Sequence, residues 1–370
     1  MLHLNMRVAF IQNRVQLGGR FQVTFEMTKV LNAMGITPDF YSYRFRINQE
    51  DIQNHYGSSI KINFHTIPEP KLPFEWNITQ FNRQVNTYVD GYDLIINSNN
   101  TSIGLSERLN LISYVHYPRK ARLMNSLSLG KLLDFNRDPL LLNALLYRWH
   151  TSTHWGDLQV ANSKFTAEKF EEHYSNDVNT ILYPPVDTRP TIATKMPNRI
   201  VSLGRFSPNK RQLDQIQMMA ELPSHELYII GFKNDVSYFN KCQKAIEDLW
   251  LNNVHLISDA TEAERDSLLA SSTFFIHSLR EEPFGITTVQ GIAAGCIPIV
   301  HNSGGQKEIV QDVDLRFESE HEIPGIIRSL QSANRMPSIK KGLQEHIKAY
   351  DTMVFRRHFK SLVEQKLPNA

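Results

Sequence analysis

The sequence has 370 residues, of which 41% are hydrophobic, 10% aromatic and 21% charged, and its formal net charge is +2 at pH 7. A nearly neutral chain without a basic patch interleaved with aromatic residues is not expected to bind nucleic acid. The length exceeds that of one ordinary core and predicts two domains of roughly 150 to 200 residues each.

The chain contains two cysteines, Cys242 and Cys296, and neither lies in a metal-binding spacing. We therefore expect a reducing compartment, with no disulfide and no zinc site. The N-terminal run MLHLNMRVAFIQN is too short for a signal sequence, an anchor or a spanning helix, and no stretch of about 18 apolar residues follows it. The expected location is cytoplasmic, and any membrane contact is expected to be peripheral, on the inner membrane face.

Short β-rich runs alternate with helical patterns along the whole chain, which predicts an α/β fold with parallel sheets buried on both faces. The strands expected in the first half are 6–11, 37–43, 61–67, 93–98, 111–116 and 158–163. Those expected in the second half are 199–204, 226–231, 254–258, 274–277 and 297–301. Each half therefore has its own series of strands.

A proline-rich stretch, YPPVDTRPTIATKMPNR at 183–199, separates the two series. Its four prolines are unsuited to a central strand or a helix interior, so we place the domain boundary here. The predicted domains are 1–185 and 186–345, and the helical segment 346–370 is expected to return to the first domain. Open α/β sheets bind ligands at the carboxyl ends of their strands, so the site is expected in a cleft between the two sheets.

The first candidate loop, QNRVQLGGRFQ, follows the opening strand. Gly18 and Gly19 allow the backbone to approach a ligand closely, and the following helix would direct free N–H groups toward it. A simple turn before a helix explains the same pair of glycines. The loop is neither a GxGxxG nor a Walker sequence, which disfavours an NAD enzyme or an NTPase.

The second candidate loop, SLGRFSPNKRQ, places Arg205 and Lys210 after a strand. Two cations at a strand end suit a diphosphate whose charge must be held and then stabilised as it leaves. The alternative is a solvated basic turn.

The third candidate is FFIHSLREEPFGITTVQGIAAGCIPIVHNSGGQKEIV at 274–310. A helix is expected to begin near Gly285 or Ile286 and to end at Gly295, with Glu282 before it and Gln290 inside it. The next strand ends at Gly304 and Gly305, a second loop suited to close backbone approach. Each piece taken separately is also compatible with ordinary turn chemistry.

Two further features are compatible with either a functional or a plain structural role. His116 ends a first-half strand, where a histidine is either packed for structural reasons or faces the cleft. Asp312 and Asp314 form an apparent DxD sequence, which we interpret as a solvated turn rather than a metal site.

The segment EPFGITTVQGIAAGCIPIVHNSGG resembles the EX7E region of retaining, GT-B-fold glycosyltransferases of family 4, and SLGRFSPNK resembles their Arg/Lys loop. YVHYPRK, RWHTSTHWGDLQVANSKFTAEKF, YPPVD and HNSGGQKEIV are similar to the mannosyltransferases that add α-1,2-mannose to lipid-linked oligosaccharides from GDP-mannose. The resemblance implies a GT-B architecture, with two Rossmann-like domains facing each other across a cleft.

The resemblance also implies roles for individual residues. Arg205 and Lys210 would hold the donor diphosphate, Glu282 would bond hydroxyls of the transferred sugar, and His116 would contact that sugar from the first domain. The remaining donor contacts would come from Gly18, Gly19, Phe284, Gly285, Ile286, Gly304 and Gly305. The second acid of the motif, which contacts the ribose, is replaced here by Gln290, so donor binding is expected to be altered.

The expected function is therefore a retaining hexosyltransferase that uses a nucleotide-sugar donor, with mannose favoured, and needs neither metal nor other cofactor. The leaving diphosphate would accept the proton of the attacking hydroxyl. The acceptor would be a glycan or a lipid-linked glycan, and the segment 119–149 either contacts an anionic membrane or packs on its own domain. The alternatives are a UDP-sugar-dependent glucosyl- or N-acetylglucosaminyl-type transferase and a nucleotide-sugar-binding subunit with weak catalysis.

Overall fold

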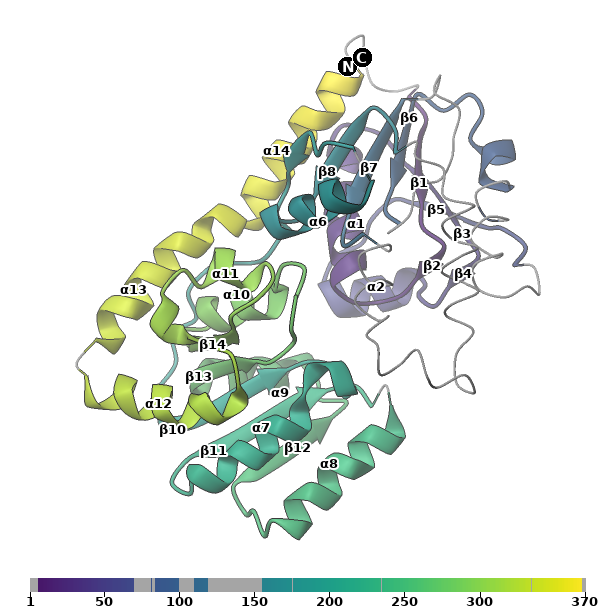
Figure 1. The fold of residues 1–370 in the computed structure, drawn as a ribbon. Helices are drawn as coiled ribbons and strands as arrows, with labels where there is room; N and C mark the ends of the chain where they lie inside the picture. The colour runs from purple at the N-terminus through teal and green to yellow at the C-terminus, as the bar shows by residue number, and fades with distance from the viewer. Residues whose placement is uncertain are drawn as a thin grey trace. The chain divides into compact units, whose positions relative to one another are not determined.

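The computed structural model describes residues 6–69, 81, 84–99, 110–118, 155–174, 176–233, 235–333 and 335–367. Internal contacts divide the chain into an N-terminal unit, Met1–Pro185 with Met353–Ala370, and a C-terminal unit, Val186–Thr352 (Figure 1). Each unit is described by itself.

The N-terminal unit contains a seven-stranded parallel sheet in the order β5-β3-β1-β6-β7-β8-β9. Its strands are β1 Val8–Ile11, β3 Asp39–Ser42, β5 Asn63–Thr66, β6 Leu94–Asn97, β7 Leu111–Val115, β8 Leu158–Ala161 and β9 Thr180–Ile181. Every residue of β1, β6, β7 and β8 is buried, because these apolar runs are covered on both faces. The strand order reverses between β1 and β6, so the loops after these two strands flank a topological switch point.

Among the described residues, the helices of this unit include α1 Gly19–Ala33, α2 Gln49–Tyr56, α6 Lys164–Tyr174 and α14 Thr352–Lys366. α14 adds Phe355, Phe359 and Val363 to the core that contains residues of β1, β3 and α1. Arg356 on α14 also donates to Glu26 on α1 at 2.6 Å. The C-terminal helix is thus an integral part of the N-terminal unit.

The C-terminal unit contains a six-stranded parallel sheet in the order β12-β11-β10-β13-β14-β15. Its strands are β10 Met196–Leu203, β11 Glu226–Gly231, β12 Val254–Ser258, β13 Ser272–His277, β14 Ile297–His301 and β15 Arg316–Phe317. This is the strand order of a doubly wound dinucleotide-binding fold, and its switch point lies between β10 and β13.

The α-helices of the C-terminal unit are α7 Gln212–Met218, α8 Val236–Asp248, α9 Glu262–Ser271, α10 Ile286–Ala293, α11 Gln306–Ile309, α12 Ile323–Ser332 and α13 Met336–His346. Short 3₁₀ helices are η1 Pro208–Lys210, η2 Met219–Glu221, η3 Val313–Leu315, η4 Glu320–Glu322 and η5 Ile347–Tyr350. α10 begins at Ile286 after Gly285, and Gly295, with a φ of 83°, follows its end. The predicted limits of this helix are confirmed.

The expectation of two α/β domains with parallel sheets is confirmed. Each strand predicted from the sequence overlaps an observed strand, although β10 and β13 begin before their predicted starts at 199 and 274. The proline-rich stretch differs from its prediction because β10 already begins at Met196 and includes Pro197. The pairing with β13 shifts register between Met196 and Ile200, and such an irregularity accommodates a proline.

The two-residue strands β9, β15, β2 Arg14–Val15 and β4 Arg44–Phe45 were not predicted, because two residues show no periodicity. Within the described residues, no helix combines the length and the apolar character needed to cross a bilayer. The segment 119–149 lies outside the described residues.

Candidate active site

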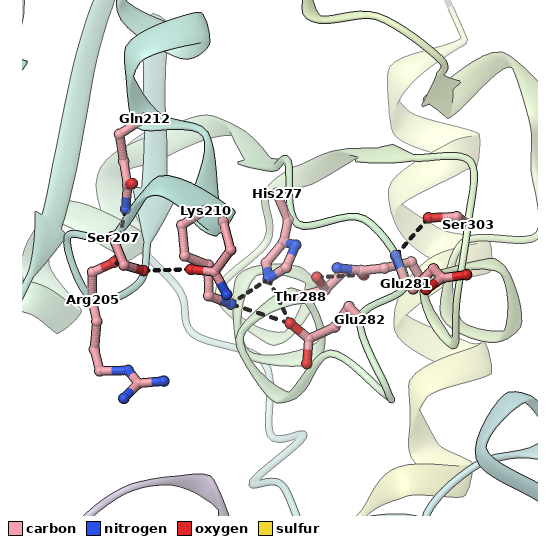
Figure 2. Close-up of polar contacts among 11 residues, drawn as sticks. Arg205, Ser207, Lys210, Gln212, His277, Glu281, Glu282, Thr288 and Ser303 are labelled. Atoms are coloured by element: carbon pink, nitrogen blue, oxygen red, sulfur yellow. Dashed lines mark hydrogen bonds and ion pairs between the residues drawn. The ribbon is translucent and has the colours of Figure 1, made fainter. Parts of the chain in front are cut away.

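The loops after β10 and β13 meet at the switch point of the C-terminal unit. Lys210 ends η1 in the first loop, and Glu282 lies in the second, between β13 and α10. Lys210 Nζ donates to Glu282 Oε2 at 3.1 Å, and the two side chains are only 19% and 18% exposed (Figure 2). The structure therefore joins two residues 72 positions apart that were each predicted to be functional.

A third side chain, His277, completes this cluster and was missed by the sequence analysis. His277 is the last residue of β13, and its side chain is 2% exposed. Its Nε2 lies 3.3 Å from Glu282 Oε2 and 3.4 Å from Lys210 Nζ (Figure 2). The available signal was its position at the end of a buried strand, the same signal that selected His116.

Electrostatics favour an ionised Glu282. Burial alone would raise the pKa of Glu282, but the charge of Lys210 and the hydrogen bonds from His277 and Lys210 outweigh burial and hold that pKa well below its usual range. Burial and the charge of Lys210 lower the pKa of His277, although Glu282 opposes this shift. At neutral pH the cluster therefore consists of a Lys–Glu ion pair beside a neutral imidazole.

Arg205 does not join this cluster. Its side chain is exposed, and Figure 2 shows the guanidinium pointing away from Lys210. Its carbonyl oxygen accepts a hydrogen bond of 2.9 Å from the buried amide of Gln212, which fixes the loop backbone. The side chains of Arg205 and Lys210 therefore point in different directions, and of these two only Lys210 contacts the Glu282 carboxylate.

The start of α10 lies beside Glu282 in the chain. Gly285 caps this helix with a φ of 118° and without a side-chain hydrogen bond. The N–H groups of a first helical turn have no partner within the helix and carry its positive dipole end. Phe284 is 2% exposed and packs against the ring of Tyr350, so its side chain anchors the loop. Gln290 lies half-buried in the second turn of α10.

Gly304 and Gly305 contact the Glu282 loop itself. A Cβ on Gly304 would lie 2.5 Å from the carbonyl oxygen of Glu282, and one on Gly305 would lie 2.4 Å from that of Pro283. The Gly305 N–H donates to the Glu282 carbonyl at 2.8 Å, and the Glu281 N–H donates to Ser303 Oγ at 2.8 Å. The backbone at Gly304 and Gly305 is closely approached, as expected, and the group that approaches it is the loop that carries Glu282. The contact with the donor stays a prediction.

The site residues predicted in the N-terminal unit lie in the segments that follow β1 and β7. Gly18 caps α1 with a φ of 139°, and both Gly18 and Gly19 are exposed. His116 follows β7, and its Nε2 lies 2.9 Å from Ser98 Oγ, just after β6. Burial and the nearby charge of Arg20 hold the pKa of His116 well below its ordinary value, so this imidazole is neutral.

The DxD sequence forms the turn η3, in which the Asp312 side chain accepts from the Asp314 N–H at 3.0 Å. Both carboxylates also pair with Arg335, at 3.4 and 2.9 Å. In the described part of the chain, no three His, Cys, Asp or Glu side chains form a group suited to hold a metal ion. Independence from metal remains a prediction.

Comparison with known proteins finds similarity to glycosyltransferases. Residues 187–325 match the family described as Glycosyl transferases group 1. The chain is 27% identical over 300 residues to the human GDP-Man:Man(3)GlcNAc(2)-PP-Dol alpha-1,2-mannosyltransferase, with 68% of this chain and 60% of the relative covered. The protein of the same name from Dictyostelium discoideum is 26% identical over 247 residues, with coverages of 55% and 48%. The chain thus spans about half to three fifths of the length of these relatives.

Solved structures share the fold at low sequence identity. WaaG, a glycosyltransferase involved in lipopolysaccharide biosynthesis, has a TM-score of 0.74 at 14% identity, with coverages of 96% of this chain and 99% of WaaG. Anabaena HepE, solved with UDP and glucose, has a TM-score of 0.71 at 16% identity, with coverages of 97% and 99%. The chain therefore has a GT-B fold with a group 1 glycosyltransferase domain at residues 187–325, and it is homologous to the GDP-Man:Man(3)GlcNAc(2)-PP-Dol alpha-1,2-mannosyltransferases.

Proposed function

We propose that this protein is a retaining glycosyltransferase that moves mannose from GDP-mannose to a glycan or lipid-linked glycan. The observation that carries the proposal is the Lys210–Glu282 pair, which lies at the switch point of the group 1 domain and next to the start of α10. The donor and the class of acceptor follow the printed names of the homologues, which contain GDP-mannose and a glycan on a dolichol diphosphate.

Lys210, Glu282 and Arg205 have distinct proposed tasks. On donor binding, Lys210 exchanges its contact with Glu282 for one with the diphosphate, whose charge also faces the N–H groups at the start of α10. Glu282, released from Lys210, accepts hydrogen bonds from sugar hydroxyls. Arg205 is exposed, and its guanidinium makes no hydrogen bond or ion pair within the described residues. It can therefore turn toward the same diphosphate.

In the proposed reaction, the bond between the anomeric carbon and the diphosphate oxygen breaks while the acceptor oxygen bonds to the same face of the sugar. The proton of the acceptor hydroxyl passes to the leaving diphosphate oxygen. This step needs no protein nucleophile, and Lys210 and the helix dipole supply the positive charge that stabilises the leaving group. We therefore include no metal ion in the proposal.

Transfer of a sugar from a UDP donor is the second candidate, because a fold neighbour was solved with UDP and glucose. A nucleotide-sugar-binding subunit with weak catalysis is the third, because Gln290 replaces an acid. Peripheral contact with a membrane carrying the acceptor belongs to the proposal as well.

The test is a panel of radiolabelled nucleotide sugars incubated with the purified protein, first without acceptor to score slow hydrolysis, then with lipid-linked oligosaccharides. We expect turnover of GDP-mannose above the other donors. Preferred turnover of a UDP-sugar would reassign the donor. Binding of a donor without turnover would support a binding subunit. If no donor is bound or turned over, the proposal that the protein is an enzyme is refuted.

A further inference from the structure

His277 contacts both charged members of the cluster and has no role in the proposed reaction. Its Nε2 lies 3.3 Å from an acceptor, Glu282 Oε2, and 3.4 Å from a donor, Lys210 Nζ. A neutral imidazole nitrogen either donates or accepts, so Nε2 serves one of these neighbours at a time. The other ring nitrogen, Nδ1, is buried without a hydrogen-bond partner among the described residues.

The surroundings of the ring select one tautomer. A proton on Nδ1 would let Nε2 accept from Lys210 Nζ, but it would leave a buried donor unpaired and turn the lone pair of Nε2 toward the Glu282 carboxylate, and these two effects are unfavourable. A proton on Nε2 avoids both and points at Glu282 Oε2. The charged groups facing the ring in the described structure are Lys210 from η1 and Glu282 from the following loop.

We propose that His277 is a positioning residue whose Nε2–H holds Oε2 of Glu282, so that Oε1 stays available to the sugar when Lys210 turns to the diphosphate. This inference rests on the proposed function. Without His277, the departure of Lys210 would leave a carboxylate only 18% exposed without either of the two donors that it has among the described residues. With His277, the carboxylate keeps one donor throughout and therefore keeps its orientation.

The first test compares His277→Gln, whose amide can donate toward Glu282, with His277→Leu, which fills space without a donor. We expect His277→Leu to lower kcat/KM by about tenfold to a hundredfold, the loss typical of a hydrogen bond to a charged group, and His277→Gln to recover most of it. His255→Gln is the matched control, because His255 lies on β12 of the same sheet.

The acid side of the pH profile separates positioning from packing. Because the hydrogen bond from His277 helps to keep Glu282 ionised, His277→Leu should move the acid limb of kcat/KM to higher pH, and His277→Gln should leave it near that of the unmodified protein. Equal rates and equal pH profiles for the Leu and Gln variants would overturn the proposal.

A second measurement does not depend on activity. In protein with ¹⁵N-labelled histidine, NMR should show the His277 proton on Nε2, and ¹³C-labelled glutamate should show a higher pKa for Glu282 in His277→Leu than in His277→Gln. A proton on Nδ1, or an unchanged pKa of Glu282, would overturn the proposal. If both NMR results hold while no nucleotide sugar is turned over, the contact with Glu282 is supported and the proposed function alone fails.

Discussion

Lys210 and Glu282 bond to each other at 3.1 Å, and each is adjacent in the chain to a non-glycine residue with a positive φ. Arg211, with a φ of 57°, follows Lys210, and Glu281, with a φ of 52°, precedes Glu282. Such conformations are unfavourable for non-glycine residues and persist where surrounding contacts impose them. Here the contacts are a buried carboxylate, Glu320, for Arg211 and Ser303 for Glu281. The fold therefore stabilises two strained turns that bring the ion pair together.

The first prediction concerns the charge of Lys210. Lys210→Met keeps most of the side-chain length and removes the ammonium, so we expect the affinity for GDP to fall by about tenfold to a hundredfold, as for the loss of a charge-assisted hydrogen bond. Isothermal titration calorimetry with GDP measures this effect. Lys244→Met is the control, because Lys244 is an exposed residue of α8 that pairs with Asp248 at 2.8 Å. Equal GDP affinities in the two variants would remove Lys210 from the donor site.

The second prediction concerns Gln290, which stands where the resemblance places an acid. Gln290→Glu should restore a charge-assisted hydrogen bond to the ribose and strengthen donor binding by about 1 to 2 kcal/mol, without loss of turnover. The dissociation constants of GDP and of 2′,3′-dideoxy-GDP measure this directly. A gain that is equally large for the dideoxy nucleotide would show that Gln290 does not face the ribose.

The third prediction concerns the contact between Gly304 and the Glu282 loop. Gly304→Ala introduces a Cβ 2.5 Å from a backbone oxygen at a residue with a φ of 71°, so the loop must move. We expect a lower melting temperature together with weaker GDP binding. Gly325→Ala is the matched control: it lies within α12 and its Cβ would meet no atom within 4 Å, so the melting temperature should hold or rise. An unchanged GDP affinity in Gly304→Ala would show that the contact of Gly304 with the Glu282 loop does not support donor binding.

The fourth prediction concerns the ion pair that supports Lys210. Arg211 Nε and Nη2 donate to the two oxygens of Glu320 at 2.6 and 3.0 Å, and the Glu320 side chain is 3% exposed. Arg211→Ala leaves a buried carboxylate unpaired and should cost about 3 kcal/mol of unfolding free energy. Glu320→Ala should cost less, because the Arg211 side chain is 28% exposed and can reach water. Urea denaturation distinguishes the two, and the opposite order would contradict this explanation.

Much of this architecture could be predicted because buried parallel strands are short, apolar and separated by helical periodicity. The loops after β10 and β13 were selected for the same reason, since strand ends in such sheets carry the ligand contacts. That β10 and β13 are neighbours is a property of the strand order in the sheet, and the hydrophobic periodicity of the sequence does not give that order. The direct contact of Lys210 with Glu282 therefore had to come from the structure.

The misses have equally specific causes. In the sequence, His277 is the last residue of the buried run FFIH, which indicates a structural role. Only the turn after β13 brings Glu282 back toward its side chain. Gly304 makes the predicted close backbone approach, to the Glu282 loop, whereas its contact with the donor stays a prediction, because a glycine does not indicate what approaches it. Pro197 was predicted to lie outside a strand, whereas the register shift in β10 accommodates it.

The most direct test of the central claim is a crystal structure of the protein with bound GDP. We expect diphosphate oxygens within hydrogen-bonding distance of Lys210 Nζ and in front of the first turn of α10, with Glu282 released from Lys210 and still bonded to His277. A diphosphate bound elsewhere, with the Lys210–Glu282 bond intact at 3.1 Å, would contradict it.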